Sequence, residues 1–237
     1  MPELAGASAP ELDALRAACD EAVGRLAADL LVVVGGDETT RGYGTDAAGS
    51  LRPYGLDLTI GPGEPVLPLS LTIGRWLLER AAGTGPTPVR FQGVAAGAAP
   101  EECLRLGRQL AGAAERVALL VMGDGSACRA EHAGDDDLDE RAEPYDAAVA
   151  RALRDADAAA LAALDPELSG ELQVAGRAAW QVLAGATGAD RPRHGGPNGS
   201  GGADGFSGAF SGAVLADLAP YGVGYFVASW RRSRPGR

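Results

Sequence analysis

The chain has 237 residues, of which 46% are hydrophobic and only 5% aromatic, and its formal net charge is −11. This surplus of acids opposes binding to nucleic acid or to an anionic membrane, because a phosphate-binding face needs clustered cations. All 21 basic residues are arginines, which excludes Schiff-base chemistry on a lysine and the lysine of a P-loop.

The length suits one α/β domain over residues 1–237, and the hydropathy is that of a soluble protein. No apolar run approaches the ~20 residues that a membrane span needs, and no charged-then-apolar leader opens the sequence. We therefore expect a cytoplasmic protein without a membrane partner.

The first predicted elements are a helix and a strand. Apolar residues recur at intervals of three and four from residue 10 onward, at Leu12, Leu15, Cys19, Val23 and Leu26. This spacing predicts an amphipathic helix that runs into a strand over 30–34. The next thirty or so residues, up to 65, are dense in Gly and Pro and predict a long extended connection with a functional or lid role.

Helices and strands alternate after that connection. A helix is predicted over 67–82, a strand over 89–95, a helix over 100–114 and an apolar strand over 117–122. This order predicts an α/β fold, a single three-layer domain whose central sheet is mainly parallel with helices on both faces.

The last third of the chain is more varied. The acidic stretch 131–144 is interpreted as a solvated loop, with cation binding as the weaker alternative because the spacing is not that of a calcium loop. Helices are predicted over 145–163 and 166–186. A flexible Gly/Ser-rich loop follows over 188–212, and a final strand is predicted over 225–230.

Two polar turns follow the buried strands, in LLVVVGGDETTRGYG (30–44) and VALLVMGDGSACR (117–129). Open α/β sheets bind their ligands at the carboxyl ends of such strands. We expect both turns to face one cleft, in which Arg41 or Arg129 pairs with a carboxylate or phosphate. The candidate ligand-binding residues are Asp37, Glu38, Thr39, Arg41, Cys128 and Arg129, and the catalytic candidates are Asp124 and Ser126.

Each turn has other interpretations. GGDETT is similar to the phosphate-binding GGDGT turn of lipid and NAD kinases, but the charge of Glu38 would repel a phosphate. GDGSAC lacks the spacing of a nucleophile elbow and has no histidine to activate Ser126. A tight turn in which Asp124 and Ser126 bond to backbone amides is the structural alternative. Cys128 beside Arg129 is a further candidate, as a reactive thiolate.

Metal ligands are sparse. The two histidines, His132 and His194, lie outside both turns, and Cys19, Cys103 and Cys128 lack metal-ligand spacing. Reduced buried thiols are the expected state of the cysteines. No metal site is predicted.

Several segments together resemble one family. They are PELAG before a helix, VVVGGD, LPLSLTIGRWLL, GDGSACR, DERAEPYDAAVARAL, AGRAAWQVLAGA and PYGVGYFVASW. In order and spacing they are similar to the class III extradiol dioxygenase superfamily, the subunit-B fold that the Memo proteins share, and above all to an actinobacterial branch. The resemblance covers nearly the whole chain.

The resemblance implies a non-haem Fe(II) site with two histidines, a carboxylate and a further acid/base histidine. This chain departs from it at each matching position. Gly36, Asp37 and Glu38 stand where a ligating histidine is expected, Ala127 replaces a histidine, and 174–177 offers no ligand. Fe(II) is therefore not expected to bind, and the family's first ligand belongs to a strand upstream of PELAG. This sequence does not contain that strand. The strand has either been lost or been left out by a start codon assigned too far downstream, and the second explanation is favoured.

Two functional hypotheses follow. The first is a dioxygenase-like protein without its iron centre that binds a small polar or aromatic molecule in the retained cleft. The second is an enzyme, either a dioxygenase with rearranged ligands such as Asp37, Glu38 and Asp124, or a metal-independent hydrolase using Ser126. A homo-oligomer, or assembly with a subunit that supplies chemistry, stays open.

Overall fold

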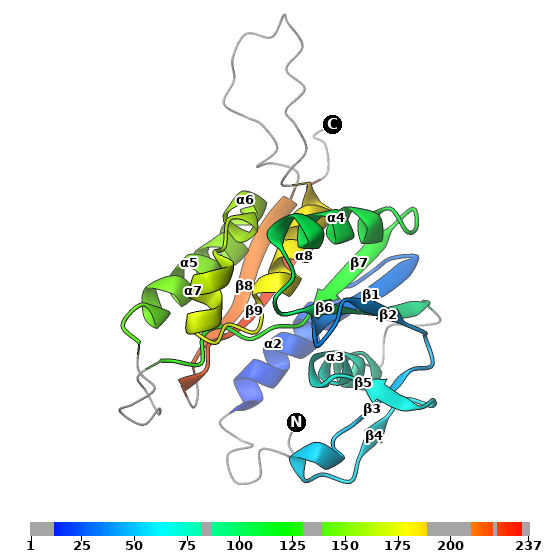
Figure 1. The fold of residues 1–237 in the computed structure, drawn as a ribbon. Helices are drawn as coiled ribbons and strands as arrows, with labels where there is room; N and C mark the ends of the chain where they lie inside the picture. Colours follow the sequence, from blue (N-terminus) through cyan, green and yellow to red (C-terminus); the bar gives the residue numbers. More distant parts are fainter. Residues whose placement is uncertain (1–11, 82–86, 130–138, 189–209, 220–221, 234–237) are drawn as a thin grey trace, which may run out of the picture.

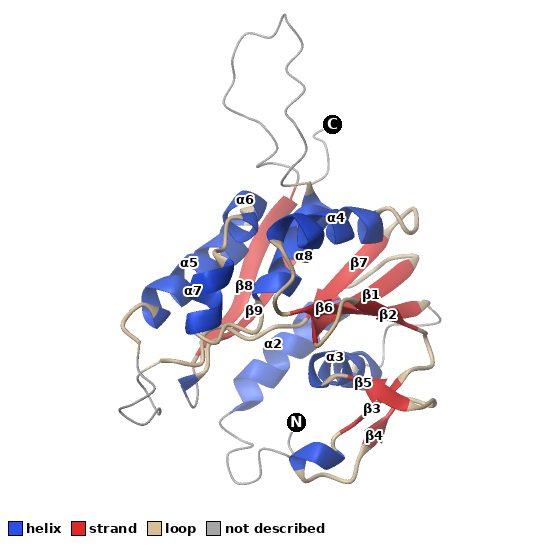
Figure 2. Cartoon of the chain, viewed as in Figure 1, coloured by secondary structure: helices blue, strands red, loops and turns tan. Residues whose placement is uncertain are grey.

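The computed structural model describes residues 12–81, 87–129, 139–188, 210–219 and 222–233. The chain has an α/β fold with a mixed central sheet (Figures 1 and 2). That sheet has the strand order β2-β6-β1-β7, in which β1 (Leu30–Asp37) runs parallel to both β6 (Val89–Ala95) and β7 (Val117–Val121). The edge strand β2 (Arg41–Tyr43) is antiparallel to β6.

Strand β1 lies at the centre because its sequence is apolar on both faces. Leu31 and Val33 pack with Val23 of α2 (Asp13–Gly24) and Leu71 of α3 (Leu69–Arg80). The alternate residues of β1, Leu30, Val32 and Val34, pack on the other face against α4 (Pro100–Ala111) and α8 (Arg177–Thr187). A strand that is buried on both faces needs such a continuous apolar run. The strands predicted over 89–95 and 117–122 are confirmed to within one residue, as β6 and β7.

A third apolar cluster lies beside the sheet. It is built by α5 (Ala142–Asp155), α6 (Ala158–Ala162), α7 (Pro166–Glu171) and α8, together with the antiparallel pair β8 (Phe210–Leu218) and β9 (Tyr225–Arg232). Trp180 of α8 meets Phe226 of β9 edge-on, with ring centroids 6.2 Å apart. The indole of Trp230 donates a hydrogen bond to the carbonyl of Leu153, which ties β9 to α5.

Both long helices predicted in the last third are interrupted. The prediction over 145–163 is wrong at Ala156, whose φ of 52° is left-handed and separates α5 from α6. The prediction over 166–186 is wrong at Gln173, with φ 53°, between α7 and α8. Asp157 and Asp165 accept hydrogen bonds from the amides of Ala160 and Leu168 and so cap α6 and α7.

The Gly/Pro-rich connection is more ordered than predicted. It contains β2 and a separate small sheet of the order β4-β3-β5, formed by β3 (Ala48–Ser50), β4 (Thr59–Ile60) and β5 (Pro65–Leu67), with the 3-10 turn Arg52–Tyr54 between β3 and β4. Gly49 allows this sheet to approach α3, since a Cβ there would lie 2.0 Å from the Thr72 hydroxyl. The prediction of an extended connection over 35–65 is therefore wrong, because the segment forms short strands.

The predicted flexible loop over 188–212 falls largely on 189–209, outside the described residues. Its last residues, 210–212, belong to β8 instead, where Phe210 pairs with Arg232. The predicted final strand is confirmed and extends to Arg232. Within the parts of the chain that the structure covers, no helix combines the length and apolarity of a membrane span.

Candidate site at the carboxyl edge of the sheet

Both predicted turns lie at the same edge of the sheet, because β1 and β7 are parallel neighbours. The segment between α7 and α8 crosses this edge. The amide of Gly176 donates to the backbone carbonyl of Asp124 at 2.9 Å, and a Cβ on Gly123 would lie 2.4 Å from the Cα of Gly176. A Cβ on Gly36 would come within 3.8 Å of the Ala175 carbonyl. Glycine is needed at position 123, because the backbones approach closely there, whereas the contact at Gly36 is an ordinary one.

The first turn is organised around Asp37. Its carboxylate accepts hydrogen bonds from the Tyr43 hydroxyl at 2.6 Å, from Nε of Arg41 at 3.1 Å and from the Glu38 amide at 2.7 Å. Burial acts to raise the pKa of Asp37, but the bonds from Tyr43, Arg41 and Glu38 outweigh it and hold the pKa below its usual value. Gly93 leaves room for the carboxylate, since a Cβ there would lie 2.4 Å from its oxygen.

The remaining candidates of the first turn are exposed. Glu38 and Thr39 are open to solvent, and the side chain of Arg41 is 53% exposed while it stacks on the Tyr43 ring at 5.1 Å. The neighbouring Thr40 is a local anchor, because its hydroxyl accepts from the Ala95 amide at 3.1 Å. The contacts of Asp37 and Thr40 therefore join this turn to β2 and β6.

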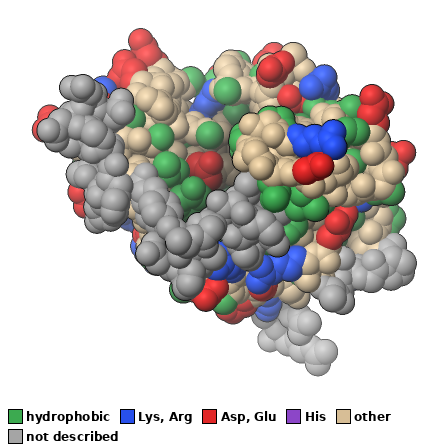
Figure 3. Space-filling view, turned by 90° about the horizontal axis from the view of Figure 1, so that it is seen from below, with side chains coloured by type: hydrophobic (Ala, Val, Ile, Leu, Met, Phe, Trp, Pro, Cys, Tyr) green, Lys and Arg blue, Asp and Glu red, His purple; other side chains and the backbone are tan. Residues whose placement is uncertain are grey.

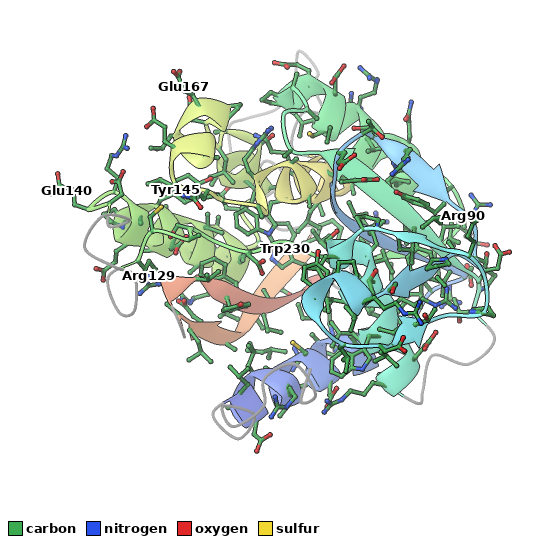
Figure 4. All side chains as sticks on the ribbon, turned by 60° about the horizontal axis from the view of Figure 1, so that its bottom comes forward. Arg90, Arg129, Glu140, Tyr145, Glu167 and Trp230 are labelled. Atoms are coloured by element: carbon green, nitrogen blue, oxygen red, sulfur yellow. The ribbon has the colours of Figure 1, made fainter. Side chains whose placement is uncertain are left out.

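The second turn is organised around a buried serine and aspartate. Ser126 is fully buried, and its amide and hydroxyl donate to the two carboxylate oxygens of Asp146 at 2.9 and 2.8 Å. The guanidinium of Arg129 lies 3.9 Å from the same carboxylate, and Figure 4 shows Arg129 beside α5 and the turn that leads into β9. Loss of solvent raises the pKa of Asp146, against the opposing effects of the Ser126 bonds and of Arg129.

This geometry favours a structural role for Ser126 over the nucleophile role. A nucleophile must reach substrate and pass its proton to a base, whereas this hydroxyl is enclosed and already donates to a carboxylate. Cys128 is buried too, with 6% exposure, so its sulfur has little access to a substrate. Cys19, Cys103 and Cys128 form no disulfide, as expected, and burial raises the pKa of the Cys19 and Cys103 thiols.

Asp124 differs from the other acids of the site. Asp124 is exposed, although neighbouring protein atoms remove part of the solvent around its carboxylate and so raise its pKa above the usual value. Among the described residues its carboxylate has no hydrogen-bond or ion-pair partner. On the face seen in Figure 3, acidic, basic and hydrophobic side chains are interspersed. Asp124 is the candidate with free capacity to bind.

The residues at this edge do not fit an iron centre. A facial Fe(II) site takes two imidazoles and a carboxylate, but the edge provides the carboxylates of Asp37 and Asp124 beside Gly36, Gly123 and Gly176. Asp37 is already held by Tyr43 and Arg41. His132 and His194 lie outside the described residues, within which no cluster of three or more potential metal ligands occurs.

Sequence reasoning missed two residues of the site, Tyr43 and Asp146. The signal for Asp146 is its position on the apolar face of α5, at the three- and four-residue spacing of Ala142, Tyr145, Val149 and Ala150, all of which are buried. An acid at such a position requires buried partners. Tyr43 carries no comparable signal, because its contact depends on β2 turning back along β6.

Known proteins offer no further guide to this site. No protein-family model matches the chain, and no curated protein matches it either. The functional argument therefore depends on the geometry.

Proposed function

We propose that the chain is a noncatalytic member of the class III extradiol dioxygenase-like superfamily and binds a small polar molecule at the carboxyl edge of its sheet. The parallel order of β6, β1 and β7, with helices packed on both faces, supports the fold part of this proposal. The placement of both turns at one edge supports the location of the site.

The observation that carries the proposal is that the Asp124 carboxylate is accessible to solvent and has no hydrogen-bond or ion-pair partner among the described residues. An accessible carboxylate without a partner among the described residues can accept hydrogen bonds from a ligand or pair with a cationic one. We therefore infer that the ligand presents an amine or hydroxyl groups to Asp124. Asp37 contributes a side chain of fixed position to the same edge, because Tyr43 and Arg41 already donate hydrogen bonds to its carboxylate.

The proposal can be tested by NMR titration of the full chain with separate sets of small amines, polyols and amino acids. We expect one class to shift the amide signals of Gly123, Asp124 and Gly176. Asp124→Asn should then weaken binding about tenfold or more, as expected for loss of a hydrogen bond to a charged group. Asp139→Asn is the matched control, because that carboxylate pairs with Arg141 instead.

Two results would contradict the proposal. If the ligand shifts amide signals only in other parts of the molecule, the site does not lie at this edge of the sheet. If Asp124→Asn binds the ligand with unchanged affinity, the Asp124 carboxylate does not take part in binding. Stoichiometric Fe(II) uptake with catechol ring cleavage that Asp124→Asn abolishes would replace the binding role with the enzymatic alternative.

A further inference from the structure

A cavity of about 580 Å³ lies between the central sheet and the β8–β9 pair. Its two long sides are strands, residues 117–121 of β7 and 228–232 of β9. Trp180 of α8 lines it from one face, and Leu26, just beyond α2, lines it from the other. In Figure 1 the two strands lie on either side of α8. We call it the β7–β9 cavity, and its volume is in the range of about 300–1,000 Å³ that small-molecule sites have.

Strand β7 turns an unpaired edge toward this cavity. The Met122 amide, just beyond β7, donates to the Val34 carbonyl at 2.7 Å. Because bonding residues alternate along a parallel strand, the even-numbered residues of β7 bond to β1. The N–H and C=O groups of Val117, Leu119 and Val121 therefore point into the cavity. A ligand along this side must supply donors and acceptors, since an apolar molecule would leave these groups unpaired.

The walls above and below this edge are apolar and aromatic. Trp180 and Leu183 of α8 line the cavity together with Phe226 and Trp230 of β9. The indole of Trp230 is fixed by its hydrogen bond to the Leu153 carbonyl. Rigid aromatic walls of this kind pack well against methyl and methylene groups. The cavity therefore suits a narrow chain that carries polar groups along one edge and apolar groups on its faces.

Arginines gather at one end of the cavity, where β7 begins and β9 ends. Among the described residues that line this cavity, Glu115 is the one acid. A second cavity of about 420 Å³ adjoins this end, since Phe210 and Arg232 line both, and no acid is among its described lining residues. The arginines that line the two cavities are Arg25, Arg108, Arg116, Arg231 and Arg232.

These arginines can bind an anion at little cost. Arg231 has no ion-pair partner among the described residues. Arg116 pairs with Asp29 at 2.5 Å, but both side chains are exposed, and such pairs contribute little to stability. Arg232 stacks on the Phe210 ring at 5.7 Å, a contact that leaves its N–H groups able to donate. Guanidinium groups bind phosphate through paired, charge-assisted hydrogen bonds, so a ligand with several phosphates fits this end.

We propose that the β7–β9 cavity binds coenzyme A through its phosphopantetheine arm. The two amide groups of this extended arm bond to the free peptide groups of β7, its methyl and methylene groups pack on Trp180 and Trp230, and its phosphates lie among the arginines. Residues 117–122 of an extended strand span roughly 17 Å, a length that the arm covers. The sulfur end therefore lies near Gly123, which lines the cavity at the carboxyl edge of the sheet.

Other occupants match fewer of these features. A fatty acid places a carboxylate among the arginines but leaves the peptide groups of β7 without partners. A free nucleotide satisfies the arginines and leaves the apolar walls uncovered. An apolar peptide pairs with β7 and supplies no anion to the arginines.

Calorimetric titration of the full chain with coenzyme A measures the binding, and NMR amide exchange locates it. We expect saturable binding that slows exchange at Val117, Leu119 and Val121 about tenfold or more, while Ala118 and Leu120 change little. Pantetheine lacks the phosphates, and adenosine 3′,5′-bisphosphate lacks the arm. Each should bind about tenfold or more weakly than coenzyme A, because each makes one half of the contacts.

Arg231→Gln should weaken the binding of coenzyme A about fivefold or more, because a charged hydrogen-bond donor is lost. Arg90→Gln is the matched control and should bind as the unaltered chain does. Arg90 is an exposed arginine of β6 that does not line the cavity (Figure 4). The comparison of the three ligands uses the unaltered chain and so does not depend on the folding of either variant.

Several outcomes would overturn the proposal. They are no binding of coenzyme A, equal affinity for adenosine 3′,5′-bisphosphate, unchanged exchange at the three amides, and tighter binding of octanoate or of an apolar peptide. Equal affinity for 4′-phosphopantetheine would overturn the choice of coenzyme A and assign the arm to another carrier. The proposed function is tested separately, because Asp124 does not line this cavity.

Discussion

Asp124 and Asp146 are both acids whose pKa is raised by loss of solvent, yet their surroundings are opposite. Asp146 is 1% exposed and accepts two bonds from Ser126, so its oxygens are occupied by the protein. Asp124 opens to solvent and has no such donors among the described residues. The same direction of pKa shift thus marks a structural acid in one case and a ligand-binding candidate in the other.

Asp124→Asn should stabilise the protein at neutral pH. The folded-state pKa of Asp124 lies above its unfolded value of about 3.9. At pH values between these two pKa values, the folded state therefore binds more protons than the unfolded state. The free energy of unfolding therefore decreases as pH rises through this window, and the substitution removes that loss. Urea titrations from about pH 3.5 to about pH 7.5 measure the effect.

Asp139→Asn gives the opposite sign and serves as the control. Hydrogen bonds from Arg141 hold the pKa of Asp139 down at about 2, so its contribution to stability is present above the unfolded value and is lost toward that lower pKa. The substitution should lower stability at neutral pH. Lower stability of Asp124→Asn at pH 7 would contradict the raised pKa of Asp124.

Ser126→Ala separates the structural role of the serine from a catalytic one. Loss of the hydroxyl leaves a buried oxygen of Asp146 without its donor, which should cost about 1–3 kcal/mol in the free energy of unfolding. Ligand binding at Asp124 should be retained, because the Ser126 hydroxyl faces α5. Urea denaturation gives the first quantity and NMR titration the second. A variant that keeps its stability but loses a hydrolytic activity would show that Ser126 is the nucleophile.

The α4–α8 packing depends on two glycines rather than on interlocking apolar side chains alone. A Cβ on Gly107 would lie 2.0 Å from the Val182 carbonyl, and one on Gly185 would lie 2.1 Å from the Leu104 carbonyl. The helix backbones therefore approach too closely for any side chain at the crossing. Arg177 adds a polar link, since its guanidinium donates to the Ala98 carbonyl at 2.7 Å and to Gln181 at 2.9 Å.

Gly185→Ala should destabilise the protein although alanine is the better helix former. The added methyl group meets backbone that cannot move aside, so we expect a loss of about 1–3 kcal/mol in the free energy of unfolding. Gly24→Ala, at the end of α2 where a Cβ meets nothing within 4 Å, should be neutral or stabilising by about 0.4–1 kcal/mol. Thermal unfolding of the two variants checks this contrast, and equal stability would mean that the helices cross elsewhere.

The elements that the sequence predicts well are those whose pattern is set by a single buried face or by continuous burial. Strands β6 and β7 and helix α3 belong to this group. The breaks at Ala156 and Gln173 were not predictable, because both residues occupy left-handed conformations that neither alanine nor glutamine favours locally. The small β4-β3-β5 sheet was missed since its strands have only two or three residues. The two turns were predicted to share an edge, but Tyr43 and Asp146 depend on contacts between distant segments.

The described molecule has two parts, with a cavity of about 580 Å³ between them that residues of β7 and β9 line. The sheet part contains β1, β6 and β7 with α2, α3 and α4, while the other part contains α5, α6, α7, β8 and β9. Helix α8 belongs to both, because Trp180 packs with α5 and the β8–β9 pair, whereas Ala179 and Val182 pack on the sheet. Helix α2 reaches across the opposite face to β8 and β9. These two helices carry much of the contact between the parts.

The protein should therefore unfold in two steps. The part that contains α5, α6, α7, β8 and β9, named the α5–β9 part, should unfold at lower urea than the sheet part. The tryptophans report on the two parts separately. Trp180 and Trp230 belong to the apolar cluster of the α5–β9 part, whereas Trp76 of α3 packs against the apolar cluster of the sheet part. In Trp76→Phe, fluorescence follows the α5–β9 part and should change at lower urea than circular dichroism. In the double variant Trp180→Phe/Trp230→Phe, fluorescence of Trp76 should change at higher urea than in Trp76→Phe. Coincident transitions for every probe would show that the two parts unfold as one cooperative unit, in spite of the cavity between them.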